Sequence, residues 1–279
     1  MKQSLFKTYK KEIIIFYVCA AISLVIASFF DLKIDISINN PSNLFASWFE
    51  ETGEMPSSLL ITVAMAFIMK CANPKWMKIV ASVCCVAGGG YFGNWFGGRL
   101  FAENEFQDAY GVIFGVGFAL TVIFVMHFIK IPENIRKPLL VVAFVGLFAG
   151  ALGTILIDSM KGLWGRVRFR SMESPYSDFT PWYKPNGNNG NHSFPSGHTA
   201  GAGVSYQLMF LPLISNKCRE HKTALFVTAF VFTSVVALTR LVMGAHYLSD
   251  VTVGGTISFT CTLLGIAFYE KFSDKLGVK

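Results

Sequence analysis

The chain has 279 residues, of which 53% are hydrophobic and 15% are charged, with a formal net charge of +7. A soluble domain carries about 25% charged residues, so this composition excludes an ordinary water-soluble protein and indicates an integral membrane protein. The positive charge is dispersed between apolar segments rather than gathered in a basic patch, which argues against a nucleic-acid partner.

Eight apolar stretches predict an all-α fold, a polytopic transmembrane helical bundle forming a single integral membrane domain over residues 1–279. Crossing the hydrocarbon takes about 20 apolar residues, fewer where flanking side chains snorkel. The glycine-rich third stretch, with Gly88, Gly89, Gly90 and Gly93, fits a re-entrant segment or, as we favour, a close helix–helix contact. The stretches cover roughly 13–30, 57–71, 77–97, 110–129, 138–158, 198–215, 223–241 and 246–269.

The distribution of basic residues orients the predicted bundle. With the N-terminus inside, 16 of the 24 Lys and Arg residues fall in inner segments. Cytoplasmic loops carry an excess of these residues, so the count predicts an even number of spans with both termini in the cytoplasm. The basic leader before the first stretch is also typical of a signal peptide, but no clear cleavage site follows, and an uncleaved anchor is expected.

Two outer loops are predicted, over residues 31–56 and 159–197. In the first, aromatic residues alternate with polar positions over about 42–52, which fits an interfacial amphipathic helix or a loop packed on the ends of the spans. The second is rich in Gly, Pro, Asn and Ser, which favour turns. A long loop of this kind is expected to carry part of the active site.

Three short runs near the ends of these stretches supply three cations, two histidines and a carboxylate. In the first, Lys161-x6-Arg168, the basic side chains share one face of a helix or tight turn. Basic residues at span ends also snorkel to the interface, but a cluster on the side where such residues are scarce favours an anionic ligand. Arg166 and Arg170 are expected at the rim.

The second run, Pro195-Ser-Gly-His198, precedes the sixth stretch. Glycine lets the backbone approach a ligand closely, and a helix start offers free N–H donors. Ser196 and Gly197 are therefore candidate phosphate donors, with His198 at the edge of the site. The alternative for this run alone is a helix start with an incidental histidine.

The third run, Thr239-Arg240-x5-His246-x3-Asp250, places His246 and Asp250 on one helix face. An aspartate that accepts a hydrogen bond from one ring nitrogen leaves the other free to attack, as in a catalytic triad with histidine as the nucleophile. The alternative is a His–Asp pair that caps a span. Ionisable residues at span edges are costly enough to favour a function.

Together the runs resemble the signature of the type 2 phosphatidic acid phosphatase superfamily: K-x6-R-P, P-S-G-H and S-R-x5-H-x3-D. The match covers about residues 161–250. Phe169 replaces the family proline and Thr239 the family serine, and neither position supplies a catalytic atom. The family core has six spans, so the eight stretches imply either two additional spans or an overcount at the third and fourth stretches.

The resemblance implies a membrane lipid phosphatase in which His246 attacks phosphorus to form a phosphohistidine. In this mechanism Asp250 orients His246 for the attack, and His198 protonates the leaving oxygen. Phosphoryl transfer needs mainly positioning and charge neutralisation, which cations supply without a metal, so no cofactor is expected. The residues to which the resemblance assigns phosphate binding are Lys161, Arg168, Ser196, Gly197 and Arg240.

The expected substrate is a phosphomonoester or pyrophosphate of a lipid, drawn from the surrounding membrane lipids. Family candidates are undecaprenyl pyrophosphate, phosphatidylglycerol phosphate, phosphatidic acid and a lipid A phosphate. The motifs contact only the phosphate, so they do not choose among these, nor between hydrolysis and transfer to an acceptor lipid. A catalytically silent lipid-binding protein fits less well with both histidines and all three cations in place. The expected location is a bacterial plasma membrane, with the site on its outer face.

Overall fold

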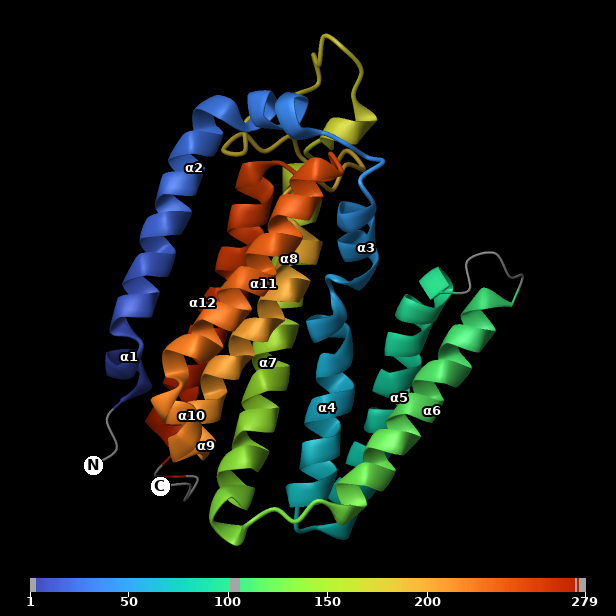
Figure 1. Cartoon of the computed structure of the whole chain (residues 1–279), viewed down its shortest axis with the longest axis vertical. Coiled ribbons are helices and arrows are strands. Elements are labelled where there is room, and N and C mark those ends of the chain that lie inside the picture. Colours follow the sequence, from blue (N-terminus) through green and yellow to red (C-terminus); the bar gives the residue numbers. More distant parts are fainter. Residues whose placement is uncertain (1–3, 101–105, 274, 276–279) are drawn as a thin grey trace.

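The computed structural model describes residues 4–100, 106–273 and 275, and within these ranges every regular element is a helix. Seven helical segments are long and apolar enough to cross a membrane. They confirm the all-α bundle, whose long helices run side by side in Figure 1. The long helices are α2 (Lys10–Ile38), α4 (Met55–Cys71), α5 (Lys75–Leu100), α6 (Gln107–Phe128), α7 (Glu133–Trp164), α11 (Lys222–Val242) and α12 (Leu248–Phe272).

The predicted stretch over 198–215 is helical but divided. It consists of α8 (Gly197–Gly203), the 3-10 helix η2 (Val204–Phe210) and α9 (Leu211–Ile214). Pro212, which lacks a backbone N–H, lies in the first turn of α9, where a proline is tolerated. No single helix in this stretch reaches the length of a span. The remaining short helices are α1 (Leu5–Thr8), α3 (Leu44–Thr52), the 3-10 turn η1 (Phe169–Ser171) and α10 (Asn216–Glu220).

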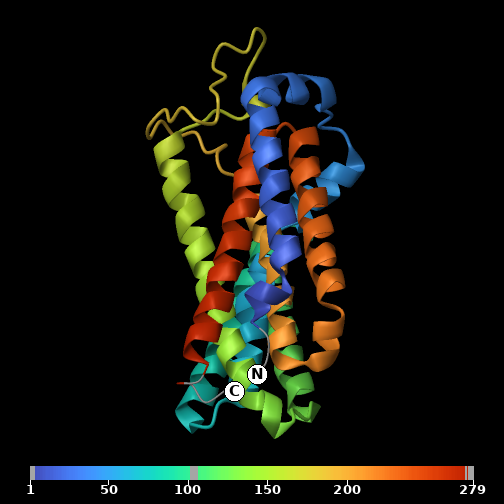
Figure 2. The ribbon, with the colours of Figure 1, turned by 90° about the vertical axis from the view of Figure 1, so that its left-hand side faces the viewer.

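Both described ends of the chain lie at the same end of the bundle. The hydroxyl of Ser4 donates to Glu270 Oε2 at 2.8 Å, which joins the start of α1 to the last turns of α12. The loop between α7 and α8 lies at the opposite end, as Figures 1 and 2 show. The seven long helices of the described ranges and the divided segment from α8 to α9 together make an even number of passes, which produces this arrangement. The termini themselves, residues 1–3 and 276–279, lie outside the described residues, so their cytoplasmic location stays a prediction.

The segment predicted as a loop over 31–56 is largely helical. Helix α2 continues to Ile38, so the loop assignment of 31–38 is wrong, and its last turns bend across the end of the bundle in Figure 1. Helix α3 forms inside the range 42–52 and is capped by Asn43, whose side chain accepts a backbone N–H. Phe45 of α3 is exposed and so is free to contact a membrane interface. That contact itself stays a prediction.

Helices α5 and α6 form a close hairpin. A Cβ on Gly93 would collide with the backbone of Gly111 and Gly115, and Gly89 and Gly97 lie along the same seam. The third stretch is therefore a continuous helix in close contact with its neighbour, and not a re-entrant segment. The hairpin packs chiefly on α4, away from the helices that carry the motifs.

Candidate active site

The three motif runs meet at one end of the bundle. Lys161 lies in the last turn of α7, His198 in the first turn of α8, and Arg240 in the last turn of α11. The backbone N–H of Ser196 donates to the Asp250 carbonyl at 2.9 Å, which joins the second run to the start of α12. Runs that are separate in the sequence therefore form one site.

Gly165 ends α7 and starts the loop that carries much of the site. Its φ of 51° lies in the left-handed region, and a side chain here would collide with Gly187 and Asn189. Because the helix reaches Trp164, the loop predicted over 159–197 is confined to residues 165–196. Figure 2 shows this loop folded over the end of the bundle.

His246 lies in the turn between α11 and α12 and is only 2% exposed. Its Nδ1 is 2.7 Å from the carbonyl oxygen of Ser193 and 3.6 Å from Oδ2 of Asp250. A carbonyl only accepts hydrogen bonds, so Nδ1 donates and Nε2 keeps the lone pair that a nucleophile needs. The motif spacing indicated Asp250 as the partner of His246 but contained no sign of Ser193, the nearer acceptor.

The environment of His246 keeps its ring neutral. Burial lowers the pKa of His246 to about 4, and the charges of Arg240 and Arg168 act in the same direction, against the nearby carboxylate of Asp250. A neutral imidazole is the form that can attack phosphorus.

Asp250 is fully buried and accepts from three donors. Arg166 Nη1 lies 2.5 Å from Oδ1, while Ser193 Oγ and the backbone N–H of Tyr247 lie 2.5 Å and 3.1 Å from Oδ2. Arg166 also donates to Asp31 of α2 at 3.0 Å, and its guanidinium lies 3.9 Å from the ring centroid of Tyr247.

The assignment of Arg166 to the rim of the site is wrong, because this side chain is 1% exposed. It forms ion pairs with two buried carboxylates and ties α2, the loop and α12 together. Asp31 and Asp35 are four residues apart at the end of the first apolar stretch. Such a pair shares a helix face, and ionisable residues near span ends indicate function, so this spacing was an available sign of the network.

The guanidinium of Arg240 is buried and only partly satisfied. Its Nη2 donates to Glu50 Oε1 at 2.8 Å, whereas Nε and Nη1 have no hydrogen-bond partner within the described part of the chain. Glu50 also accepts from Arg170 at 3.1 Å. Arg168 lies close enough for the charges of Arg170 and Arg240 to act on it. Buried donors without partners are costly, so this cluster of cations suits an anionic ligand.

Lys161, Ser196 and Gly197 lie together at the start of α8. A Cβ on Gly197 would be 2.9 Å from Nζ of Lys161, so the amine reaches this backbone. Ser196 Oγ accepts from the backbone N–H and the hydroxyl of Thr199, at 3.3 Å and 3.1 Å. Both of its lone pairs are used, and its own O–H remains available to an anion.

His198 contacts two acidic residues that the motifs did not include. Its Nδ1 lies 3.1 Å from Glu54 Oε1, and its Nε2 lies 3.2 Å from the backbone oxygen of Glu50. These residues belong to α3 and the turn before α4, where no recognisable spacing marked them.

The two positions that depart from the family pattern pack within the protein. Phe169 is buried and stacks on Tyr176, with ring centroids 5.3 Å apart. Thr239 is also buried, and its hydroxyl donates to the Val236 carbonyl of its own helix at 2.7 Å.

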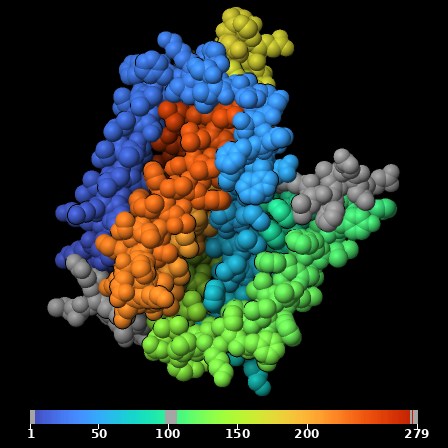
Figure 3. All heavy atoms as spheres, viewed as in Figure 1, coloured from blue at the N-terminus to red at the C-terminus, as the bar shows by residue number. Residues whose placement is uncertain are grey.

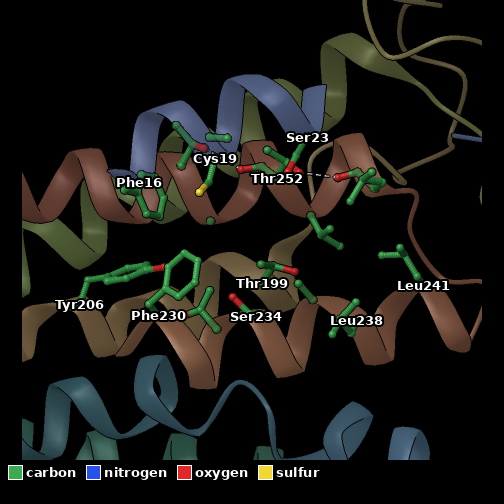
Figure 4. A pocket seen from close by; sticks show the side chains of 17 residues that line it. Phe16, Cys19, Ser23, Thr199, Tyr206, Phe230, Ser234, Leu238, Leu241 and Thr252 are labelled. Atoms are coloured by element: carbon green, nitrogen blue, oxygen red, sulfur yellow. Dashed lines mark hydrogen bonds between the residues drawn. The ribbon is translucent and has the colours of Figure 1, made fainter. Parts of the chain in front are cut away.

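Two cavities border the site. The larger, about 890 Å³, lies between α4, α5, α7 and α8, and its lining includes Glu54, Lys161 and Gly197 together with many apolar side chains. The smaller, about 250 Å³, lies among α2, η2, α11 and α12. Figure 4 shows Phe16 and Thr252 facing Ser234 across it, and Figure 3 shows the hollow between α2 and α11 on this face. Binding pockets typically measure about 300–1,000 Å³, so the larger cavity has the size of a ligand site.

The chain is similar to known membrane phosphatases. The family model of the PAP2 superfamily matches residues 136–274. Phosphatidylglycerophosphatase B of Bacillus subtilis (strain 168) is 27% identical over 145 residues, which cover 48% of this chain and 68% of that protein. A solved structure of a transmembrane PAP2 type phosphatidylglycerolphosphate phosphatase from Bacillus subtilis is 19% identical, with a TM-score of 0.36, and the match covers 89% of this chain and 96% of that one. The matched region contains all three motif runs, and the chain therefore belongs to the PAP2 superfamily, in its branch of membrane lipid phosphatases.

Proposed function

We propose that this protein hydrolyses the phosphate ester of a membrane glycerolipid through a phosphohistidine at His246. The observation that carries the proposal is the pairing of a neutral, buried histidine with a buried arginine, Arg240, that has two unpartnered N–H donors. A tetrahedral phosphate uses such donors to spread the charge that develops in phosphoryl transfer.

The remaining residues complete the proposed chemistry. Arg168 adds positive charge beside Arg240, and Lys161 brings its amine to Gly197. Ser196 and Gly197 offer an O–H and an N–H to the phosphate oxygens. These groups supply the charge neutralisation that a metal ion would otherwise provide, so we propose a metal-independent reaction. Asp250 supports His246 at 3.6 Å and fixes Ser193, the acceptor for its Nδ1 proton.

The larger cavity supports a lipid as the substrate. It runs from Lys161 and Gly197 along apolar residues of α4, α5 and α7, so a hydrocarbon chain can lie there while its phosphate reaches the cations. The similarity to phosphatidylglycerophosphatase B makes phosphatidylglycerol phosphate the first candidate. The excess of inner basic residues supports a site on the outer face of a bacterial plasma membrane.

A panel of lipid phosphates tests the substrate and the metal requirement. We expect the purified protein to release phosphate from phosphatidylglycerol phosphate in preference to phosphatidic acid, undecaprenyl pyrophosphate and a lipid A phosphate, at the same rate with and without EDTA. The measurement is free phosphate against time. Transfer of radiolabel to an acceptor lipid without free phosphate would identify a phosphotransferase, and loss of activity in EDTA would contradict metal independence.

The pH profile tests the state of His246. Because the pKa of His246 is lowered to about 4, protonation should remove the nucleophile only as the pH falls through that value. The pH dependence of kcat/KM reports groups of the free enzyme. We expect kcat/KM to stay level down to about pH 5 and to fall only as the pH drops through about 4. Return of each sample to pH 7 controls for unfolding. An acid limb near 6.5, the ordinary histidine value, would contradict this neutral, buried environment.

A further inference from the structure

Two acidic residues outside the family-matched region contact the second histidine of the site. Glu54 Oε1 lies 3.1 Å from Nδ1 of His198, and the backbone oxygen of Glu50 lies 3.2 Å from Nε2. The side chains of His198 and Glu54 are only 22% and 24% exposed, so water covers little of the pair. Glu54 also lines the larger cavity together with Lys161 and Gly197, which places it beside the proposed path of the lipid.

The neighbours of His198 favour one protonation state of its ring. An ionised carboxylate and a backbone carbonyl are both acceptors. A neutral imidazole has one N–H, whereas the imidazolium has one at each nitrogen. The surroundings of His198 therefore match a ring that carries both protons, which is the form a general acid has before it protonates a leaving oxygen.

His246 has the opposite environment. Its Nδ1 donates to a neutral carbonyl, and the nearest oxygen of Asp250 lies 3.6 Å away on a carboxylate that Arg166 already neutralises. Hydrogen bonds to ionised groups are about twice as strong as those between neutral groups, so Glu54 supports a protonated ring more than Ser193 does. The two histidines are thus set apart as a neutral nucleophile and a protonated acid, the division of roles that this chemistry requires.

We propose that Glu54 is a positioning residue that holds His198 as the general acid of the reaction. This inference rests on the proposed function. The Nε2 lone pair of His246 bonds to phosphorus, the ester P–O bond breaks with its electron pair going to the alcohol oxygen, and that oxygen takes the Nε2 proton of His198. When water attacks the phosphohistidine, its proton returns to His198 and the N–P bond breaks. Glu54 remains a carboxylate throughout and keeps the Nδ1–H of His198 directed toward it.

Leaving-group dependence separates this role from a structural one. An alkoxide leaves poorly without a proton, whereas 4-nitrophenolate needs none. The variant Glu54→Gln keeps the size of the side chain and removes its charge. We expect it to lower kcat/KM for a glycerolipid phosphate about 10-fold or more, and kcat/KM for 4-nitrophenyl phosphate less than about threefold, since general acid catalysis contributes about 10²–10⁴-fold. Glu51→Gln, at an exposed neighbour on α3, is the matched control and should change neither value.

A second measurement uses the lipid alone. With ¹⁸O at the bridging ester position, the isotope effect on kcat/KM should be larger for Glu54→Gln than for the wild type, because the oxygen then departs without its proton. Equal losses on both esters with an unchanged isotope effect, or no loss on either ester, would overturn the role of Glu54. Wild-type protein that turns over no lipid phosphate would instead contradict the proposed function itself, before any variant is compared.

Discussion

Replacement of His246 by alanine should abolish phosphate release from the lipid substrate. His246 is the proposed nucleophile, and its Nε2 is left with a free lone pair because Nδ1 donates to Ser193. Removal of a nucleophile from a site whose groups act together lowers kcat by about 10⁴-fold or more, since positioning and charge alone provide the residual rate. The measurement is release of ³²P from labelled lipid by purified wild type and variant.

A trapped intermediate makes this test more specific. When the reaction is quenched in alkali within one turnover, the wild-type protein should carry a label that is stable to base and lost in acid, as expected of a phosphorus–nitrogen bond. The label should be absent from His246→Ala. His192→Ala is the matched control, because this histidine is exposed in the loop over 165–196 and should retain both label and rate. A labelled His246→Ala protein would place the intermediate on another residue and contradict the mechanism.

Replacement of Arg166 by methionine should produce the largest loss of stability of any single change in the site. The variant keeps most of the side-chain volume but leaves Asp31 and Asp250 without their shared counter-ion. Breaking a buried pair by removal of one partner typically costs about 3–5 kcal/mol. We expect a clear fall in the melting temperature of the detergent-solubilised protein, together with loss of activity.

The matched control for this variant is Lys184→Met, which removes a positive charge from an exposed position in the same loop and should leave the melting temperature unchanged. If Arg166 acted only at the rim of the site, as its place beside the first motif suggested, Arg166→Met would unfold at the wild-type temperature. That result would contradict the structural role of the network.

The motif residues could be placed from the sequence because their spacing is local. His246 and Asp250 are four residues apart, and although His246 lies in the turn before α12, this short separation still brings its Nδ1 to 3.6 Å from Oδ2 of Asp250. The long helices could also be predicted from the sequence, since a membrane span needs only a continuous apolar stretch. The division of the helix over 197–214 could not be predicted, because apolar composition does not distinguish an α-helix from a 3-10 helix such as Val204–Phe210.

The contacts that complete the site could not be predicted, because they join distant parts of the chain. Glu54 is well over a hundred residues from His198, and Asp31 is 135 residues from Arg166 in the sequence. None of these acidic residues belongs to a motif. Ser193 was missed for a different reason: its backbone oxygen is the group that contacts His246, and a backbone atom leaves no mark in the residue pattern.

The Asp31–Arg166–Asp250 network has a consequence for the biogenesis of the protein. A chain made from its N-terminus delivers α2 to the membrane with Asp31 already near the end of the helix, 135 residues before Arg166 emerges from the ribosome. Asp250 follows Arg166 by a further 84 residues. Throughout this interval a carboxylate in apolar surroundings lacks its counter-ion and is favoured at the aqueous surface. The counter-ion of Asp31 is therefore available only after α7 has been made, and the three-residue network is complete only when α12 follows.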